Sequence, residues 1–300
     1  MGGKSWILGR RSIRHSVAAI GISIGVCSEI WGSAPGGFRK DWPNELKVGM
    51  VATYGVKESE ARSQPLIHHL EQKLGLKINC RVSNDFNWFL VSFAKKELDF
   101  ALMGPSNYVD AHKLFGVEAV AMELSEDGKP GYYSVIVTSA SSGINSIDQG
   151  RGRVLAFTDQ NSTSGFIIPT IYFIKEKKQT PARFASRVVF TGTPQDLVQG
   201  VLSQKYDLGA TNDWTLARLS ESLKFRPDQL RVLWKSELIP GAPWVTRKDL
   251  PVSLQFAFRE ALLEFNENKS ALKKMQSGGF RSARDGDYDV IREWHKFLPR

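Results

Sequence analysis

Short apolar runs alternate with longer stretches of helical periodicity along most of the 300 residues, and this alternation constrains the fold most strongly. In the first half, buried strands are expected at residues 46–52, 77–82, 98–103, 117–124 and 132–138. Helices are expected between these strands, at 64–74, at 85–96 and from the Gly104-Pro105 turn to about residue 114. Strands separated by helices indicate an α/β chain with a mainly parallel sheet and right-handed crossovers.

The alternation begins again after residue 150. Strands are expected at 153–158, 188–191, 206–210 and 230–234, and helices at 164–177, 195–203 and 213–222. The run 230–234 is expected to be the last strand, followed by helices at 251–266 and 285–298 that pack on the first sheet. The pattern therefore predicts two α/β lobes with a cleft between them. Lobe 1 is expected to contain residues 44–134 plus 238–300, and lobe 2 residues 135–237.

The first 33 residues have the pattern of an export signal with a linker. Arg10, Arg11 and Arg14 precede the apolar run 16–26, which is too short to span a bilayer comfortably, and small residues follow at 31–34. This pattern predicts an exported, periplasmic protein. Anchoring to the membrane would require an uncleaved amino end or a lipid on Cys27, whose sequence context fits lipoprotein processing poorly. With Cys27 removed or modified, only Cys80 remains, so no internal disulfide is expected.

The formal net charge of +9 is distributed without a basic block interleaved with aromatic residues. This distribution does not favour nucleic acid as a partner. A mild positive bias suits a small anionic ligand, although solvated surface lysines and arginines explain it at least as well.

Small polar residues gather where the expected strands end, and the densest group is Ser162, Thr163, Ser164 and Gly165. Ligands of open α/β sheets bind outside the carboxyl ends of the strands. A helix amino terminus there exposes unpaired N–H groups and a partial positive charge, so neighbouring hydroxyls can hold a tetrahedral oxyanion without a lysine. An ordinary helix N-cap is the alternative interpretation. Three hydroxyls followed by glycine favour a ligand site.

Other strand ends contribute further candidates. A second strand-to-helix turn, at Gly104-Pro105, is expected to face the cleft from the other lobe. The strand ends are mostly uncharged, which predicts a site made of neutral donors. Core packing remains the alternative for the tyrosines. The additional candidate ligand-binding residues are Ser106, Asn107, Tyr108, Tyr54, Tyr133, Thr193 and Asp213.

The sequence gives little support to an enzyme. It contains no Walker-type phosphate loop, dinucleotide-binding glycine motif, serine-hydrolase turn or zinc-protease motif. The match of Ser270 and Lys273 to a serine–lysine pattern is interpreted as coincidence, because no lysine–threonine–glycine motif follows. The adjacent His68 and His69 diverge on a helix. No catalytic residue, no cofactor and no metal is therefore expected.

In the order of their motifs, residues 46–283 resemble the substrate-binding proteins of phosphonate, phosphite and phosphate ABC transporters. The matching elements are Gly104-Pro105 with Tyr108, Tyr133-Ser134, Asp159 with Ser162 to Gly165 and Pro169, Phe190-Thr191-Gly192, Asp207, and Ile239-Pro240. The resemblance implies the two-lobed type II periplasmic binding protein fold, with two mainly parallel sheets joined by crossover hinge strands near 133–139 and 230–234. It also implies that Ser162, Thr163 and Ser164 grip a small phosphorus oxyanion that is passed to a membrane permease.

Two departures from that family pattern bear on the ligand. The histidine that usually follows the Phe-x-Gly turn is replaced by Thr193 and Pro194, and the segment 241–243 lacks the acidic residue often found there. An aminoalkylphosphonate is therefore less favoured than phosphite, methylphosphonate or phosphate, and Trp214 indicates a more apolar wall. The alternative function is a protein that presents its ligand to a signalling receptor. Nothing in the sequence indicates an oligomeric state.

Overall fold

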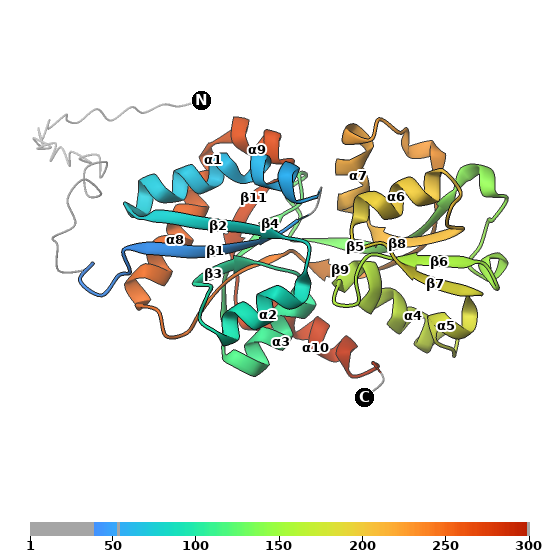
Figure 1. Ribbon diagram of the computed structural model, residues 1–300, viewed down its shortest axis with the longest axis horizontal. Helices are drawn as coiled ribbons and strands as arrows, with labels where there is room; N and C mark the ends of the chain where they lie inside the picture. Colours follow the sequence, from blue (N-terminus) through green and yellow to red (C-terminus); the bar gives the residue numbers. More distant parts are fainter. Residues whose placement is uncertain (1–38, 53–54, 299–300) are drawn as a thin grey trace, which may run out of the picture. The chain divides into compact units, whose positions relative to one another are not determined.

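The computed structural model describes residues 39–52 and 55–298, and its main unit begins at Asp41. This unit contains a six-stranded and a five-stranded β-sheet, each flanked by helices (Figure 1). We call the first sheet with its helices lobe 1 and the second lobe 2. The predicted export signal and Cys27 lie outside the described residues. Within the described ranges, no helix is long and apolar enough to cross a membrane.

The sheet of lobe 1 has the strand order β11-β4-β10-β3-β1-β2. Its strands are β1 (Glu45–Val51), β2 (Lys77–Ser83), β3 (Phe100–Leu102), β4 (Glu118–Leu124), β10 (Pro243–Thr246) and β11 (Gly279–Ser282). Strand β1 pairs in parallel with β2 and β3, whereas β10 runs antiparallel to β3 and β4. Strand β11 is antiparallel to β4. The sheet is therefore mixed, with the parallel strands β3, β1 and β2 together at one edge and antiparallel pairs in the rest. The sheet of lobe 2 also combines parallel and antiparallel pairs, so the prediction of two mainly parallel sheets is wrong.

Helices cover both faces of this sheet. They are α1 (Val56–Leu74), α2 (Phe86–Ala94), α3 (Pro105–Phe115), α8 (Val252–Glu264), α9 (Lys269–Met275) and α10 (Asp289–His295). On one face, α1 and α8 enclose a core in which Phe258 stacks on Phe100 with ring centroids 3.8 Å apart. On the other face, α2, α3 and α10 bury Phe89, Tyr108 and Ile291. The second of these cores contains Tyr108, Val109 and Ala111 and fixes α3 on the sheet.

The sheet of lobe 2 has the strand order β7-β6-β8-β5-β9. Its strands are β5 (Gly131–Ser139), β6 (Val154–Phe157), β7 (Arg187–Phe190), β8 (Leu208–Asn212) and β9 (Leu230–Pro240). Its helices are α4 (Ile168–Glu176), α5 (Pro181–Phe184), α6 (Pro194–Leu202) and α7 (Asp213–Ser222). Leu197 of α6 and Leu219 of α7 belong to one core, and Phe173 of α4 and Phe184 of α5 belong to the other.

Two antiparallel neighbours, β5 and β9, carry the chain between the sheets. The chain passes from β4 into β5 and returns from β9 into β10, and the pairing of β5 with β9 runs from Gly131↔Pro240 to Ser139↔Leu230. The crossover strands predicted near 133–139 and 230–234 are therefore confirmed. The predicted lobe boundaries, after residues 134 and 237, fall inside β5 and β9 and stay a prediction.

The prediction that residues 230–234 form the last strand is wrong. Strand β9 continues to Pro240, and β10 and β11 follow it. Strand β10 is only four residues long and entirely buried, so it lacks the period-two alternation that marks a half-buried strand. The short helix α9 was also not anticipated, and α1 begins at Val56 rather than at residue 64.

Candidate ligand-binding site

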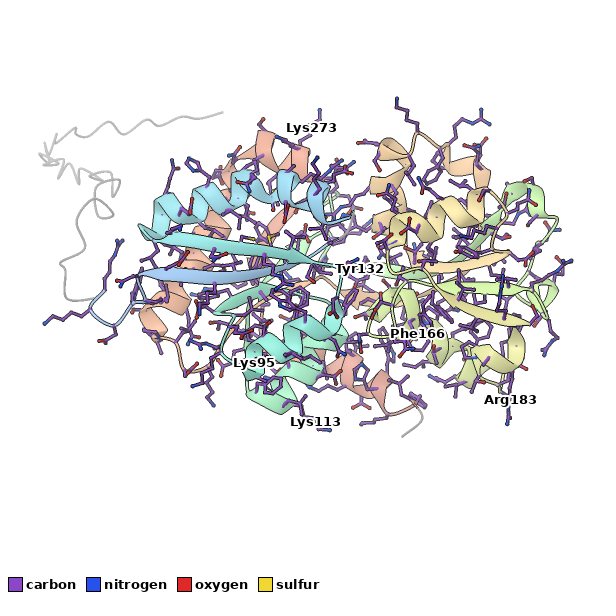
Figure 2. The ribbon with its side chains drawn as sticks, in the orientation of Figure 1. Lys95, Lys113, Tyr132, Phe166, Arg183 and Lys273 are labelled. Atoms are coloured by element: carbon purple, nitrogen blue, oxygen red, sulfur yellow. The ribbon has the colours of Figure 1, made fainter. Side chains whose placement is uncertain are left out.

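A cavity of about 110 Å³ lies where the strand ends of both lobes meet. Lobe 1 supplies residues from β1, β3, β4 and the start of α3. Lobe 2 supplies residues from β8, α7 and the turn η3 (Thr163–Ile167). The lining residues are Val51, Ala52, Phe86, Leu102, Gly104, Glu123, Tyr132, Ser162, Thr163, Ser164, Pro194, Asn212, Trp214, Thr215, Arg218 and Ala242. Figure 2 shows Tyr132 at the junction of the two lobes.

The predicted serine–threonine–serine run forms one wall of this cavity. After β6 the chain enters a π-helical turn, η3 (Thr163–Ile167), which continues directly into α4. Ser162 is the N-cap, and its hydroxyl accepts a hydrogen bond from the backbone N–H of Gly165 at 3.1 Å. The N-cap interpretation and the ligand interpretation therefore apply to the same residue, because Ser162 also lines the cavity.

Gly165 has a packing role of its own. A Cβ at this position would lie 2.0 Å from Thr158 Oγ1 and 2.8 Å from Ser162 Oγ. Its carbonyl oxygen accepts a hydrogen bond from the Thr158 N–H, so the turn is folded back tightly against the end of β6. Glycine is thus required by the close approach of the chain to itself.

Ser164 is held in place by hydrogen bonds to both its side chain and its backbone. Its hydroxyl accepts a hydrogen bond from Asn212 Nδ2 at 3.1 Å, and its carbonyl oxygen accepts one from Ser134 Oγ at 2.7 Å. Burial raises the pKa of the neighbouring Tyr132 phenol, and a hydrogen bond with the Ser164 side chain opposes that rise. Tyr132 is therefore a protonated, neutral donor at any physiological pH.

The amino terminus of α3 reaches the cavity from lobe 1. Gly104 is its N-cap without a side-chain hydrogen bond, and Pro105 follows at the first helical position. The Ser106 N–H donates a hydrogen bond to Thr163 Oγ1 at 3.0 Å, so the first turns of α3 and η3 meet. The buried Asn107 Oδ1 has no hydrogen-bond partner among the described residues. Two helix amino termini therefore bring their partial positive charges to one cavity.

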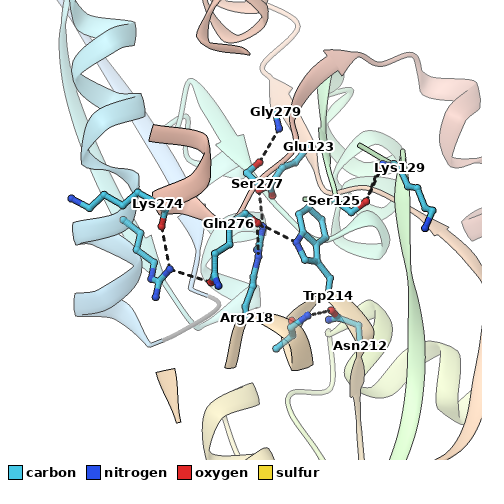
Figure 3. A network of polar contacts seen from close by, with 12 residues as sticks. Glu123, Ser125, Lys129, Asn212, Trp214, Arg218, Lys274, Gln276, Ser277 and Gly279 are labelled. Atoms are coloured by element: carbon cyan, nitrogen blue, oxygen red, sulfur yellow. Dashed lines mark hydrogen bonds and ion pairs between the residues drawn. The ribbon is translucent and has the colours of Figure 1, made fainter. Parts of the chain in front are cut away.

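A charged pair forms the wall supplied by β4 and α7, which corrects the expectation of a purely neutral site. Arg218 Nη2 of lobe 2 donates to Glu123 Oε1 of lobe 1 at 3.1 Å, and both residues are less than a tenth exposed (Figure 3). The guanidinium lies 4.0 Å above the Trp214 ring. Removing one partner of such a buried pair costs about 3–5 kcal/mol, because the other charge stays buried and uncompensated.

Seven predicted site residues that the structure describes are not among the lining residues: Gly165, Ser106, Asn107, Tyr108, Tyr133, Thr193 and Asp213. Tyr108 is fully buried, donates to Asp285 and packs on Tyr288, and burial raises the pKa of its phenol. Its predicted role is replaced by packing within lobe 1. Thr193 serves as the N-cap of α6, where its hydroxyl accepts from the Asp196 N–H at 3.1 Å.

Tyr133 and Asp213 pair with each other beside the cavity. The Tyr133 N–H donates to Asp213 Oδ1 at 2.9 Å, and Lys235 contacts both the Tyr133 ring and the Asp213 carboxylate. Tyr133 was predicted to line the cavity, but Tyr132 does so. Successive side chains of a strand point to opposite faces, so only one of these two tyrosines can face the cavity from β5. Ser106 and Asn107 stand directly behind the lining, and Tyr54 lies outside the described residues.

Several lining residues were missed from the sequence. Trp214, predicted to form an apolar wall, does line the cavity, but Arg218 was missed although it lies four residues further along α7, a spacing that places both side chains on one helix face. The carboxylate of Glu123 next to the apolar residues 119–122 of β4 was a second available signal. Asn212 could have been read from its position as N-cap of α7. No group of three or more histidine, cysteine or acidic side chains suited to a metal ion occurs within the described part of the chain.

Two α/β sheets joined by two crossover strands, with a cavity between their strand ends, define a substrate-binding protein of the type II periplasmic class. The model of the ABC transporter phosphonate periplasmic substrate-binding protein family matches residues 48–288, and the chain belongs to this family. The family consists of binding proteins without a catalytic role. The phosphonates-binding periplasmic protein of Escherichia coli K12 is 28% identical over 83% of this chain and 75% of its own.

Solved structures support the same fold. A binding-protein component of an ABC phosphonate transporter from Pseudomonas aeruginosa aligns with a TM-score of 0.79 at 23% identity, over 84% of this chain and 86% of its own. PhnD1 from Prochlorococcus marinus, solved with methylphosphonate, aligns with a TM-score of 0.75 at 20% identity, over 85% of this chain and 98% of its own. The predicted type II fold is therefore confirmed.

Proposed function

We propose that this protein binds a small phosphorus oxyanion (a phosphonate with a small substituent, phosphite or phosphate) in the cavity lined by Ser162, Thr163 and Ser164. One observation carries the proposal. The first turns of α3 and η3 meet at the Ser106 N–H to Thr163 Oγ1 contact, and the hydroxyls of η3 line the cavity beside that contact. Helix amino termini and hydroxyl donors together stabilise a bound anion that has lost its hydration shell.

The donor set can support useful affinity. Each hydrogen bond to a charged group contributes about 1.5–3 kcal/mol. Hydroxyls of η3, the Tyr132 phenol and the free Nη1 of Arg218 are available donors within the described residues. Several such bonds offset the cost of binding and give micromolar affinity, which corresponds to about 8 kcal/mol.

The size of the cavity favours a small ligand. Its volume of about 110 Å³ is well below the roughly 300–1,000 Å³ of pockets for drug-sized ligands. Methylphosphonate, the ligand present in the structural neighbour from Prochlorococcus marinus, is of the appropriate size. The loaded protein would then deliver the anion to the permease of an ABC importer, the partner that family membership implies.

Isothermal titration calorimetry of the purified protein with methylphosphonate, phosphite, phosphate and sulfate tests this proposal. We expect micromolar or tighter binding of at least one of the three phosphorus anions, and weaker binding of sulfate. If none of the three binds more tightly than millimolar, the proposed ligand class is wrong.

A further inference from the structure

The wall of the cavity supplied by β4 and α7 carries two opposite charges that face each other across the lobes. Arg218 lies on α7 of lobe 2 and Glu123 on β4 of lobe 1, and the closest nitrogen and oxygen are 3.1 Å apart. Both residues line the cavity that also contains the hydroxyls of Ser162 and Ser164. Any substituent on an anion bound at those hydroxyls must share this small cavity with the pair.

The guanidinium of Arg218 is held by Gln276 and Trp214 in addition to Glu123. Its Nε and Nη2 donate to the carbonyl oxygen of Gln276 at 3.1 and 2.8 Å, and the Trp214 ring lies beneath it. Trp214 Nε1 donates to the same carbonyl oxygen at 3.4 Å (Figure 3). This arrangement leaves the guanidinium little freedom to move away from Glu123.

One polar atom of each partner remains available. Nη1 of Arg218 and Oε2 of Glu123 make no hydrogen bond within the described residues, whereas the facing atoms Nη2 and Oε1 are bonded to each other. A substituent therefore meets a donor and an acceptor whose opposite charges nearly cancel. An ammonium near Glu123 is repelled by Arg218, and a carboxylate near Arg218 is repelled by Glu123.

We propose that the Arg218–Glu123 pair determines ligand specificity, by disfavouring ligands whose substituent carries a charge of either sign. This inference rests on the proposed function, since it concerns the substituent of the same oxyanion. Specificity of this kind is a difference in binding free energy created by repulsion as well as attraction. Removing one partner should therefore convert the wall into a site for a substituent of the matching charge.

Two pairs of ligands of nearly equal size isolate the effect of charge. Aminomethylphosphonate differs from ethylphosphonate by an ammonium in place of a methyl group, and phosphonoformate differs from acetylphosphonate by a carboxylate oxygen in place of a methyl group. The measured quantity is the ratio of dissociation constants within each pair, obtained by calorimetry. The ratio cancels any general loss of affinity that a variant causes by weakening the contact between the lobes.

In the wild type we expect both charged ligands to bind more weakly than their neutral counterparts. Arg218→Gln should shift the first ratio by about tenfold in favour of aminomethylphosphonate, because Glu123 is left without its partner. Glu123→Gln should shift the second ratio by a similar factor in favour of phosphonoformate. Arg218→Lys and the double variant Glu123→Gln/Arg218→Gln should both retain ratios close to those of the wild type.

The outcomes separate the two proposals. If ethylphosphonate or methylphosphonate binds the wild type but neither single variant shifts its ratio, the specificity inference is wrong and the oxyanion site stands. If no phosphonate binds the wild type but phosphite or phosphate does, the specificity inference is wrong and the oxyanion site stands. If none of these phosphorus anions binds, the proposed function fails and the inference fails with it. Thermal unfolding verifies that each variant is folded, and Glu123→Gln alone decides the inference if Arg218→Gln does not fold.

Discussion

The backbone N–H of Ser106 donates a hydrogen bond to the hydroxyl of Thr163 over 3.0 Å, and this bond joins the first turn of α3 in lobe 1 to that of η3 in lobe 2. The two residues are 1% and 2% exposed. Since Thr163 also lines the cavity, one side chain takes part both in the contact between the lobes and in the proposed binding of the anion.

Thr163→Val should weaken binding of the oxyanion by about tenfold or more, because a hydrogen bond to a charged group contributes about 1.5–3 kcal/mol. Valine has nearly the same shape but offers no acceptor to the Ser106 N–H. Calorimetry with the best ligand measures the change, and Thr163→Ser serves as the control that keeps the hydroxyl. Equal affinities for the valine and serine variants would contradict the role of this hydroxyl.

Ser162→Ala should lose both helix capping and ligand affinity. Loss of the cap to Gly165 should lower the free energy of unfolding by about 0.5–2 kcal/mol. The matched control is Thr193→Ala, which removes the N-cap of α6 but lies outside the cavity lining. Chemical denaturation should show a comparable loss for both variants, whereas calorimetry should show weaker binding for Ser162→Ala only. A similar loss of affinity in Thr193→Ala would return that residue to the site.

Gly165→Ala should destabilise lobe 2, since its Cβ would lie 2.0 Å from Thr158 Oγ1. Overpacking of this kind typically costs about 1–3 kcal/mol. Adding Thr158→Ala removes the clashing hydroxyl and should restore part of the lost stability, although Ser162 Oγ still lies 2.8 Å from the new Cβ. The midpoints of denaturant unfolding for the single and double variants test this, and a double variant no more stable than Gly165→Ala would refute the packing explanation.

His295 should make the protein less stable in mild acid. Burial lowers the pKa of this imidazole, and the carboxylate of Asp110, 3.9 Å away, opposes the shift only in part. Because the folded state binds the proton less readily than the unfolded chain, stability is unaffected above the ordinary histidine pKa of about 6.5 and falls as the pH drops below it. The raised pKa of Asp110 has the opposite effect, in the lower range near the ordinary pKa of about 4.

The free energy of unfolding, measured at pH 7.5 and at pH 5.5, tests the role of His295. His295→Gln keeps a polar group within reach of Ser106, whose hydroxyl contacts the imidazole at 3.0 Å, but it cannot titrate. The decrease between the two pH values should be smaller in this variant than in the wild type. An equal decrease would assign the acid sensitivity to other groups.

The fold was predictable where an element is long or carries its own start signal. Helix α7 was expected at 213–222 and occurs at Asp213–Ser222, because the side chain of Asn212 caps it and its apolar residues recur with helical spacing. Strands β10 and β11 were missed although they are as long as β6 and β7, which were predicted, so their length does not explain the difference. Their positions depend on pairing with β3 and β4, which are distant in sequence and leave no local pattern.

The same physical limit applies to the site. Ser162, Thr163 and Ser164 were found because they are consecutive at one strand-to-helix turn, and a helix start has a recognisable local sequence. Glu123 and Arg218 were not, because 95 residues separate them and each alone resembles an ordinary surface charge. The sequence analysis named Tyr133 as a candidate, but the neighbouring Tyr132 lines the cavity. The sequence alone does not determine which face of β5 is turned to the cavity.

The position of β10 between β3 and β4 has a consequence for the order of folding. Lobe 2 is built from one continuous stretch of chain from β5 to β9, so all of its strands are present once the ribosome has made residue 240. The centre of the other sheet stays incomplete until residues 243–246 arrive, because β3 and β4 are joined through them. During synthesis the middle of the polypeptide can therefore reach its native structure before the part that precedes it.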